Sequence, residues 1–204
     1  MRRTLSAAAL AALCASFGAA PAGGQVPTFT IDRDHTKVMF RVRHLGVAWV
    51  TGQFREFEGS FTFDSANLAA AGARLTIRTA SIDTEVERRD NHLRSPDFFA
   101  ADSFPEITFA SRSVERGATP GTYRMTGDLT IRGISRPIAL DVELIGMRTV
   151  AGQQGRSVVA GFVLTGRVSR FDYGLRWNNV LEGEWIVAEE VRIVVEVEAR
   201  APAG

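Results

Sequence analysis

The residues of this chain that could do chemistry are few and scattered. The three histidines, His35, His44 and His92, lie on separate segments, without the i, i+4 spacing or the clustered carboxylates of a typical metal site. The sequence has no nucleophile elbow, HExxH zinc motif, phosphate-binding loop or GxGxxG motif. We therefore predict no catalytic residues, no metal site and no cofactor.

Two arginines are better placed to bind a ligand. By the alternation of its strand, Arg136 should point into the fold or lie at its rim, and Arg170 follows the end of another strand. A guanidinium group binds phosphate or carboxylate through two parallel hydrogen bonds. We predict that Arg136 and Arg170, with His35 and His92, hold the head group of a ligand. The alternative for each arginine is a structural ion pair, with Asp90, Asp128 or Asp172 as the partner.

Residues 1–22 have the pattern of a secretory signal peptide. Arg2 and Arg3 precede a nearly unbroken apolar run over residues 5–17, and small residues follow it. This run is shorter than the roughly 20 residues that span a bilayer, which argues against a membrane anchor. Cys14 lies inside this apolar run, and this position argues against Cys14 as a lipoprotein cysteine. We expect export to the periplasm and a mature chain without a thiol.

Composition indicates that residues 23–204 form a globular domain with a dry interior. Hydrophobic residues make up 45% and charged residues 23% of the chain, which excludes disordered and fibrous classes. The formal net charge of +1 argues against a nucleic-acid partner. The chain has 13 Phe but only 2 Tyr, and phenylalanine has no polar group to keep near water.

Alternation of apolar and polar residues predicts eight strands. They fall at residues 37–43, 53–63, 73–78, 107–109, 123–132, 138–144, 158–164 and 191–198. We predict an all-β fold, a single eight-stranded antiparallel barrel, because closure buries the apolar faces and removes both sheet edges. Such a barrel is filled by side chains or holds one small ligand. A two-sheet sandwich is the alternative.

A short helical insertion separates the third and fourth predicted strands. Thr84 and Glu87 have the spacing of a capping box, which predicts a helix from Thr84 that ends before Pro96. Three phenylalanines follow between residues 97 and 105. We predict that this apolar loop plugs one mouth of the barrel.

The inward-facing apolar side chains and the plug are predicted to line a cavity for an apolar tail. They are Phe40, Val42, Phe54, Leu75, Ile77, Phe98, Phe99, Phe104, Phe109, Leu129, Ile131, Phe162 and Leu164.

Several short motifs, in the right order, resemble those of the YceI-like family. They include DHTKVMF at 34–40, RDNHLRS at 89–95, FPEITFAS at 104–111, GDLTIRG at 127–133 and RFDYG at 170–174. The resemblance runs from about residue 29 to residue 199. It implies a lipocalin-like antiparallel barrel in the periplasm that holds a polyisoprenoid chain, such as an isoprenoid quinone or a prenyl pyrophosphate, without catalytic residues.

Three functions follow as hypotheses. The leading one is a periplasmic carrier or buffer of an isoprenoid lipid, with transient membrane contact and a homodimer as further expectations. The second is a stress or interaction protein whose barrel is filled by side chains. The third is an enzyme acting on a lipid head group, with His35, Asp90, His92 and Arg170 as candidate residues; it requires these four to lie within hydrogen-bonding reach of one another.

Overall fold

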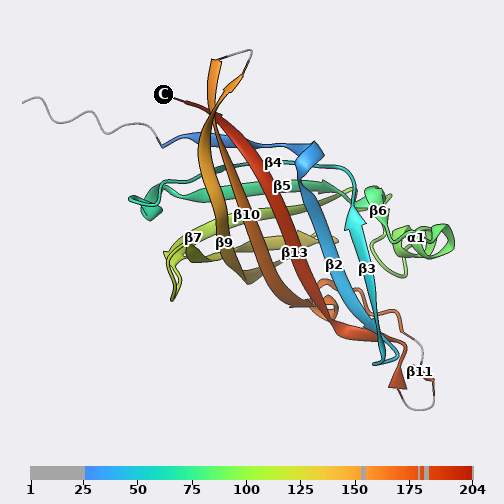
Figure 1. Ribbon diagram of the computed structural model, residues 1–204. Coiled ribbons are helices and arrows are strands. Elements are labelled where there is room, and N and C mark those ends of the chain that lie inside the picture. Colours follow the sequence, from blue (N-terminus) through green and yellow to red (C-terminus); the bar gives the residue numbers. More distant parts are fainter. Residues whose placement is uncertain (1–25, 153–154, 179, 182–183, 204) are drawn as a thin grey trace, which may run out of the picture.

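A computed structural model describes residues 26–152, 155–178, 180–181 and 184–203. The predicted signal peptide, with Cys14, lies outside the described residues. Strands make up most of the described chain, and one short α-helix lies to one side of them (Figure 1). Within these ranges no helix has both the length and the apolar character needed to cross a membrane.

The elements, in chain order, are β1 (Thr28–Ile31), η1 (Arg33–His35), β2 (Lys37–His44), β3 (Ala48–Phe54), β4 (Phe57–Thr62), η2 (Leu68–Ala70), β5 (Gly72–Arg78), η3 (Thr79–Ser81), β6 (Ile82–Asp83), α1 (Glu87–Arg94), β7 (Glu106–Arg116), β8 (Thr122–Ile131), β9 (Ile134–Gly152), β10 (Gly155–Ser169), η4 (Arg170–Tyr173), β11 (Val180–Leu181), β12 (Glu184–Trp185) and β13 (Val187–Pro202).

Eight strands close into an antiparallel barrel. Their order around the ring is β1-β4-β5-β7-β8-β9-β10-β13, and β13 closes the ring by pairing with β1, with Thr30 opposite Arg200. This closure confirms the predicted barrel. The remaining strands of the sheet, β2, β3 and β6, extend it from β13 beyond the ring.

Three neighbouring strands break at the same level, and these breaks split the sheet. β1 and β2 follow each other in the chain and both pair with β13. In the same way β4 directly follows β3, and β6 follows β5 after the short η3 turn. Each of these three pairs is therefore one strand interrupted once. Backbone bonds join the breaks: Arg55 N–H donates to Ser81 O (3.1 Å) and Arg78 N–H to Glu56 O (2.9 Å). The single strand predicted over residues 53–63 is therefore wrong, because one part pairs inside the ring and the other outside it.

The helix forms within the predicted span, but it starts at Glu87 rather than at Thr84 and not through the predicted cap. It starts at Glu87, and its N-cap, Val86, makes no side-chain capping bond. The Asp90 carboxylate, rather than Glu87, reaches back to Thr84 and accepts hydrogen bonds from its backbone N–H (2.9 Å) and its hydroxyl. The capping box is thus wrong, because Asp90, one turn into the helix, supplies the acceptor that the box assigns to the helix start.

The last residue of α1 ties the helix to the broken strand beside it. The Arg94 guanidinium donates to Ala80 O (2.7 Å) and to Ile82 O (2.8 Å) of the η3–β6 segment. The segment that follows α1 returns to the ring at Pro105, whose carbonyl accepts from Thr79 N–H (2.9 Å). The insertion is thereby anchored at the open side of the split sheet.

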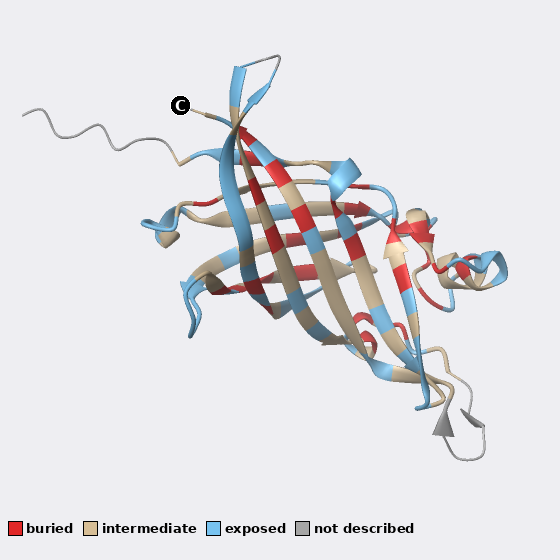
Figure 2. Ribbon diagram, viewed as in Figure 1, coloured by how far each residue is buried: buried red, intermediate tan, exposed pale blue. Residues whose placement is uncertain are grey.

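The barrel interior is built from alternate residues of each strand. On β13, Val197, Ala199 and Ala201 are buried, whereas Glu196 and Arg200 are exposed (Figure 2). Phenylalanine rings pack across the interior, including Phe63 against Phe162 with ring centroids 5.2 Å apart. Burying one such ring stabilises the fold by about 1.5–3 kcal/mol.

A substitution at Gly127 tests how tightly the strands pack around the interior. A Cβ added there would lie 2.5 Å from Ala110 O and 2.5 Å from the Phe109 ring. Because backbone cannot yield as a side chain does, we expect Gly127→Ala to lower the free energy of unfolding by about 1–3 kcal/mol. Urea denaturation measures this change. Gly146→Ala is the control, because no atom lies within 4 Å of its added Cβ, and equal stability of the two variants would contradict the account.

Candidate functional site

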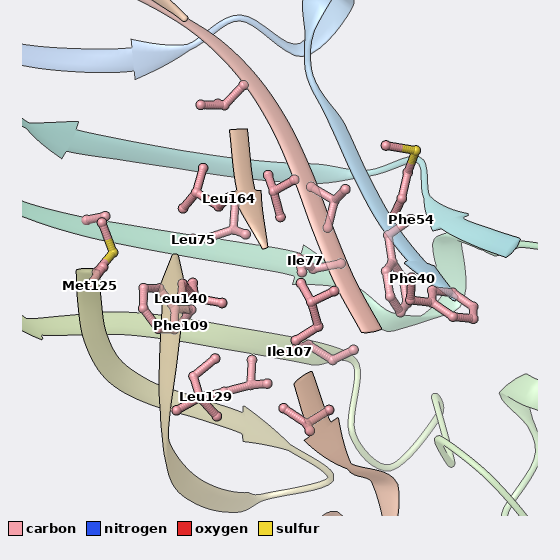
Figure 3. A pocket seen from close by; sticks show the side chains of 18 of the residues that line it. Phe40, Phe54, Leu75, Ile77, Ile107, Phe109, Met125, Leu129, Leu140 and Leu164 are labelled. Atoms are coloured by element: carbon pink, nitrogen blue, oxygen red, sulfur yellow. The ribbon is translucent and has the colours of Figure 1, made fainter. Parts of the chain in front are cut away.

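The barrel encloses an apolar cavity. Its volume is about 240 Å³, below the range of about 300–1,000 Å³ typical of small-molecule sites. Leucine, isoleucine and phenylalanine side chains converge on it from strands on several sides (Figure 3). The interior is therefore not filled by side chains, which counts against the hypothesis of a filled barrel.

Twelve of the thirteen residues predicted for the tail cavity line it. They are Phe40, Val42, Phe54, Leu75, Ile77, Phe98, Phe99, Phe109, Leu129, Ile131, Phe162 and Leu164. Whether they contact a ligand stays a prediction.

Phe104 does not line the cavity, and its predicted place there is wrong. The chain turns back at Ala100, which has a φ of 48° and whose carbonyl accepts from Phe104 N–H (2.9 Å). The turn places the Phe104 ring near the Arg132 guanidinium, whose central carbon lies 5.9 Å from the ring centroid.

Phe98 and Phe99 plug the barrel as predicted, and other rings hold them there. Phe99 meets Phe54 edge to face, with centroids 5.9 Å apart. Phe98 packs on Trp177 (5.2 Å) and on the ring of His92 (5.0 Å). The phenylalanines therefore close the gap that the split sheet leaves.

His92 belongs to the outside of this plug rather than to the cavity. Its Nε2 lies 2.9 Å from Asp97 Oδ2, and its ring packs on Trp177 with centroids 4.8 Å apart. Arg132 connects the plug to the segment after η4, because its guanidinium donates to Phe98 O (2.5 Å) and to Gly174 O (3.4 Å). Contrary to the prediction, His92 does not line the cavity.

His35 also lies away from the cavity, in a surface cluster. Its Nδ1 is 3.1 Å from Asp32 Oδ2, and this bond raises the pKa of the histidine. Asp32, His35 and Glu198 offer ligand atoms within 4.8 Å of one another, but Arg200 bonds both carboxylates (3.3 and 3.0 Å). The cluster is a surface ion-pair network, so the predicted contact of His35 with the ligand is not supported.

Arg136 lies at the barrel rim, one of the two places that strand alternation allows. It is exposed and does not line the cavity, although it stands opposite the buried Leu129 in the β8–β9 register. Its Nε donates to the backbone carbonyl of Asp172 (3.4 Å) rather than to a carboxylate. The side chain of this residue, near the start of β9, therefore lies on the surface of the barrel beside η4.

Arg170 is the one predicted head-group residue that reaches the cavity. It is buried and its guanidinium donates to the carbonyls of Ala188 (3.0 Å), Val187 (3.0 Å), Trp177 (2.9 Å) and Leu175. No carboxylate of the described residues lies within ion-pair distance of it, so the predicted ion-pair alternative is wrong for this arginine. Burial lowers its pKa, but an arginine stays charged. The lining of the cavity therefore includes a buried positive charge.

Tyr173 is a site residue that the sequence analysis missed. It lines the cavity three residues after Arg170 and is 1% exposed. Its hydroxyl makes no hydrogen bond within the described part of the chain, and burial raises its pKa to about 12. A buried donor left unsatisfied costs about 1–3 kcal/mol. The Tyr173 hydroxyl is therefore a buried donor without an acceptor, three residues from a buried charge.

The four residues of the enzyme hypothesis are not assembled. Among the described residues, His35 bonds Asp32, His92 bonds Asp97, Asp90 accepts from Thr84, and Arg170 bonds backbone carbonyls. None of the hydrogen bonds found in this part of the structure joins any two of them. The grouping therefore provides no acid–base pair.

The fold and site together define an antiparallel β-barrel that encloses an apolar cavity with a polar end. The model of the YceI-like domain matches residues 29–199, and the chain belongs to this family. It is 36% identical to Protein YceI of Shigella flexneri over 200 residues, covering 97% of each chain.

Solved structures share the fold. Burkholderia cenocepacia BcnA superposes with a TM-score of 0.69 at 24% identity, covering 82% of this chain and 98% of that one. A polyisoprenoid binding domain from Saccharophagus degradans, implicated in plant cell wall breakdown, superposes with a TM-score of 0.59 at 15% identity. That match covers 85% of this chain and 98% of the other.

The position of Tyr173 predicts a loss of stability at high pH. Its pKa is about 12 in the folded protein and about 10 in the unfolded chain, so the folded state favours the neutral phenol. The contribution of this preference to the free energy of unfolding is fully present below pH 10. It falls by about 2–3 kcal/mol between about pH 10 and pH 12, where the phenol ionises in the unfolded chain first. Urea denaturation of ligand-free protein, compared with Tyr173→Phe, measures it. The variant should lose less stability over this range, and equal losses would contradict the burial of an unpaired hydroxyl.

Proposed function

We propose that this protein is a periplasmic carrier or buffer of an isoprenoid lipid. The observation that carries the proposal is the apolar cavity, whose lining includes Arg170 and Tyr173. An apolar tail costs about 0.8 kcal/mol for each CH₂ group exposed to water, so a single lipid needs an enclosed carrier. The ring of strands and the plug of Phe98 and Phe99 supply that enclosure.

The polar end fits the two head groups that the family resemblance implies. The Tyr173 hydroxyl is a free donor to a carbonyl oxygen, such as that of a quinone. Four of the five N–H groups of Arg170 are accounted for by its four carbonyl partners, and its charge favours a phosphate nearby. The proposal therefore places the tail among the phenylalanines and the head group beside η4.

Other facts support the ligand class and the location. The Saccharophagus degradans neighbour is described as a polyisoprenoid binding domain and shares the barrel. The pattern of residues 1–22 supports export. A carrier of this kind must contact a membrane transiently to load and release its ligand.

Extraction of the bound lipid tests the proposal. Protein purified from its own cells is extracted with organic solvent, and the extract is analysed by mass spectrometry. We expect close to one isoprenoid lipid per chain. Recovery of no stoichiometric lipid would contradict the proposal.

A bulky side chain inside the cavity should displace the ligand. Val195 lines the cavity, whereas Val194, next to it on β13, does not. We expect Val195→Trp to lower the amount of extracted lipid at least several-fold, since the indole would occupy the space of the tail. Val194→Trp is the matched control and should retain the lipid. Equal lipid content in the two variants would show that the ligand lies elsewhere.

A further inference from the structure

The turn between β2 and β3 presents apolar side chains to solvent. Val47 is 84% exposed and Trp49, the second residue of β3, is 37% exposed. We call residues 45–49 the hairpin tip. It lies at the opposite end of the molecule from the β9–β10 hairpin (Figure 1). The hairpin tip therefore presents a largely exposed valine and a partly exposed tryptophan to solvent.

Arginines surround the indole of this tip. The guanidinium carbons of Arg192, Arg41 and Arg43 lie 4.4, 5.0 and 5.8 Å from the Trp49 ring. Strand register also places Arg41 opposite Arg192 and Arg192 opposite Arg167. Like charges directly opposite each other destabilise a sheet unless an anion lies near them. The row therefore favours a negatively charged partner.

Acidic residues balance only part of this charge. Glu190 contacts Arg192 (3.5 Å) and Arg167 (3.4 Å), and Glu189 accepts a hydrogen bond from Ser169 (2.6 Å). In the described part of the chain, neither Arg41 nor Arg43 lies within ion-pair distance of a carboxylate. Among the described side chains, the surface around the tip therefore carries more positive than negative charge.

Backbone contacts connect the tip to the polar end of the cavity. Arg170 Nη2 donates to Val187 O (3.0 Å), and Val187 stands opposite His44 in the β2–β13 register. The next residue, Leu45, donates its N–H to Ile186 O (2.9 Å). The tip thus begins one residue beyond the strand pair that holds Arg170.

We propose that the hairpin tip and its arginines dock the protein on an anionic phospholipid bilayer. Tryptophan prefers the boundary between head groups and acyl chains, and arginines bind the phosphates and anionic head groups there. Val47 would enter the apolar layer, as the apolar side of an interfacial segment does. The inference rests on the proposed function, since it names the surface through which the carrier reaches its lipid.

Vesicle flotation tests the docking surface. The whole protein is mixed with phosphatidylcholine vesicles, with or without about one-third phosphatidylglycerol, at low and high salt. We expect flotation only with the anionic vesicles, and at least tenfold less of it at 1 M salt, where charges are screened over about 3 Å. Val47→Ser and the double variant Arg41→Gln, Arg43→Gln should each reduce flotation several-fold.

Matched variants elsewhere on the barrel complete the experiment. Ile145→Ser removes another exposed apolar side chain, on β9, and Arg112→Gln removes a charge on β7. Both should float as the unchanged protein does. Flotation of neutral vesicles alone, or equal losses in the tip and control variants, would overturn the inference. The inference would also be overturned if light scattering showed that the tip variants change from dimer to monomer while the unchanged protein binds no vesicles.

The extracted lipid separates this result from the proposed function. The tip variants should retain lipid in the amount found for the unchanged protein, because Val47, Arg41 and Arg43 do not line the cavity. Retained lipid without any flotation would overturn the docking surface and leave the carrier standing. Flotation without any bound lipid would keep the surface but contradict the carrier.

Discussion

The coincident break in three neighbouring strands is the constraint on which the rest of the structure depends. Because the breaks lie side by side, β1, β4 and β5 can close the ring with β13 while β2, β3 and β6 leave it. The departure opens one side of the barrel, and the insertion after β6 fills it. An interior lined by apolar side chains can stay dry only if that opening is closed, so Phe98 and Phe99 are part of the cavity as much as the strands are.

A buried charge and a buried phenol make one part of the cavity lining different from the apolar remainder. Arg170 is held by the carbonyls of the two segments that meet at this end, so the same contacts close the barrel and place a positive charge inside it. Tyr173 follows in the same turn of η4, and its hydroxyl has no acceptor within the described chain. An amphipathic ligand would therefore bind with its head group at η4 and its tail along the phenylalanines.

Much of this could be predicted because alternation and composition are local signals. The strands, the barrel and the plug follow from residue periodicity and from an apolar loop that water would not solvate. Some failures depend on pairing between distant segments: the break within residues 53–63 and the surface positions of His35 and His92. Others are local details of backbone geometry: the capping box at Thr84 and the turn at Ala100 that carries Phe104 away. Tyr173 had a usable signal, since a tyrosine beside Arg170 is unusual in a chain with 13 Phe and 2 Tyr.

The central claim is that an amphipathic lipid fills the cavity with its head group at Arg170 and Tyr173. A crystal structure of the protein purified from its own cells, without extraction, tests this claim most directly. We expect continuous electron density for a single lipid chain between the phenylalanines, ending in a polar group within hydrogen-bonding distance of the Tyr173 hydroxyl. Density for ordered water alone, or a collapsed interior with the rings of Phe40, Phe109 and Phe162 in the cavity, would contradict it.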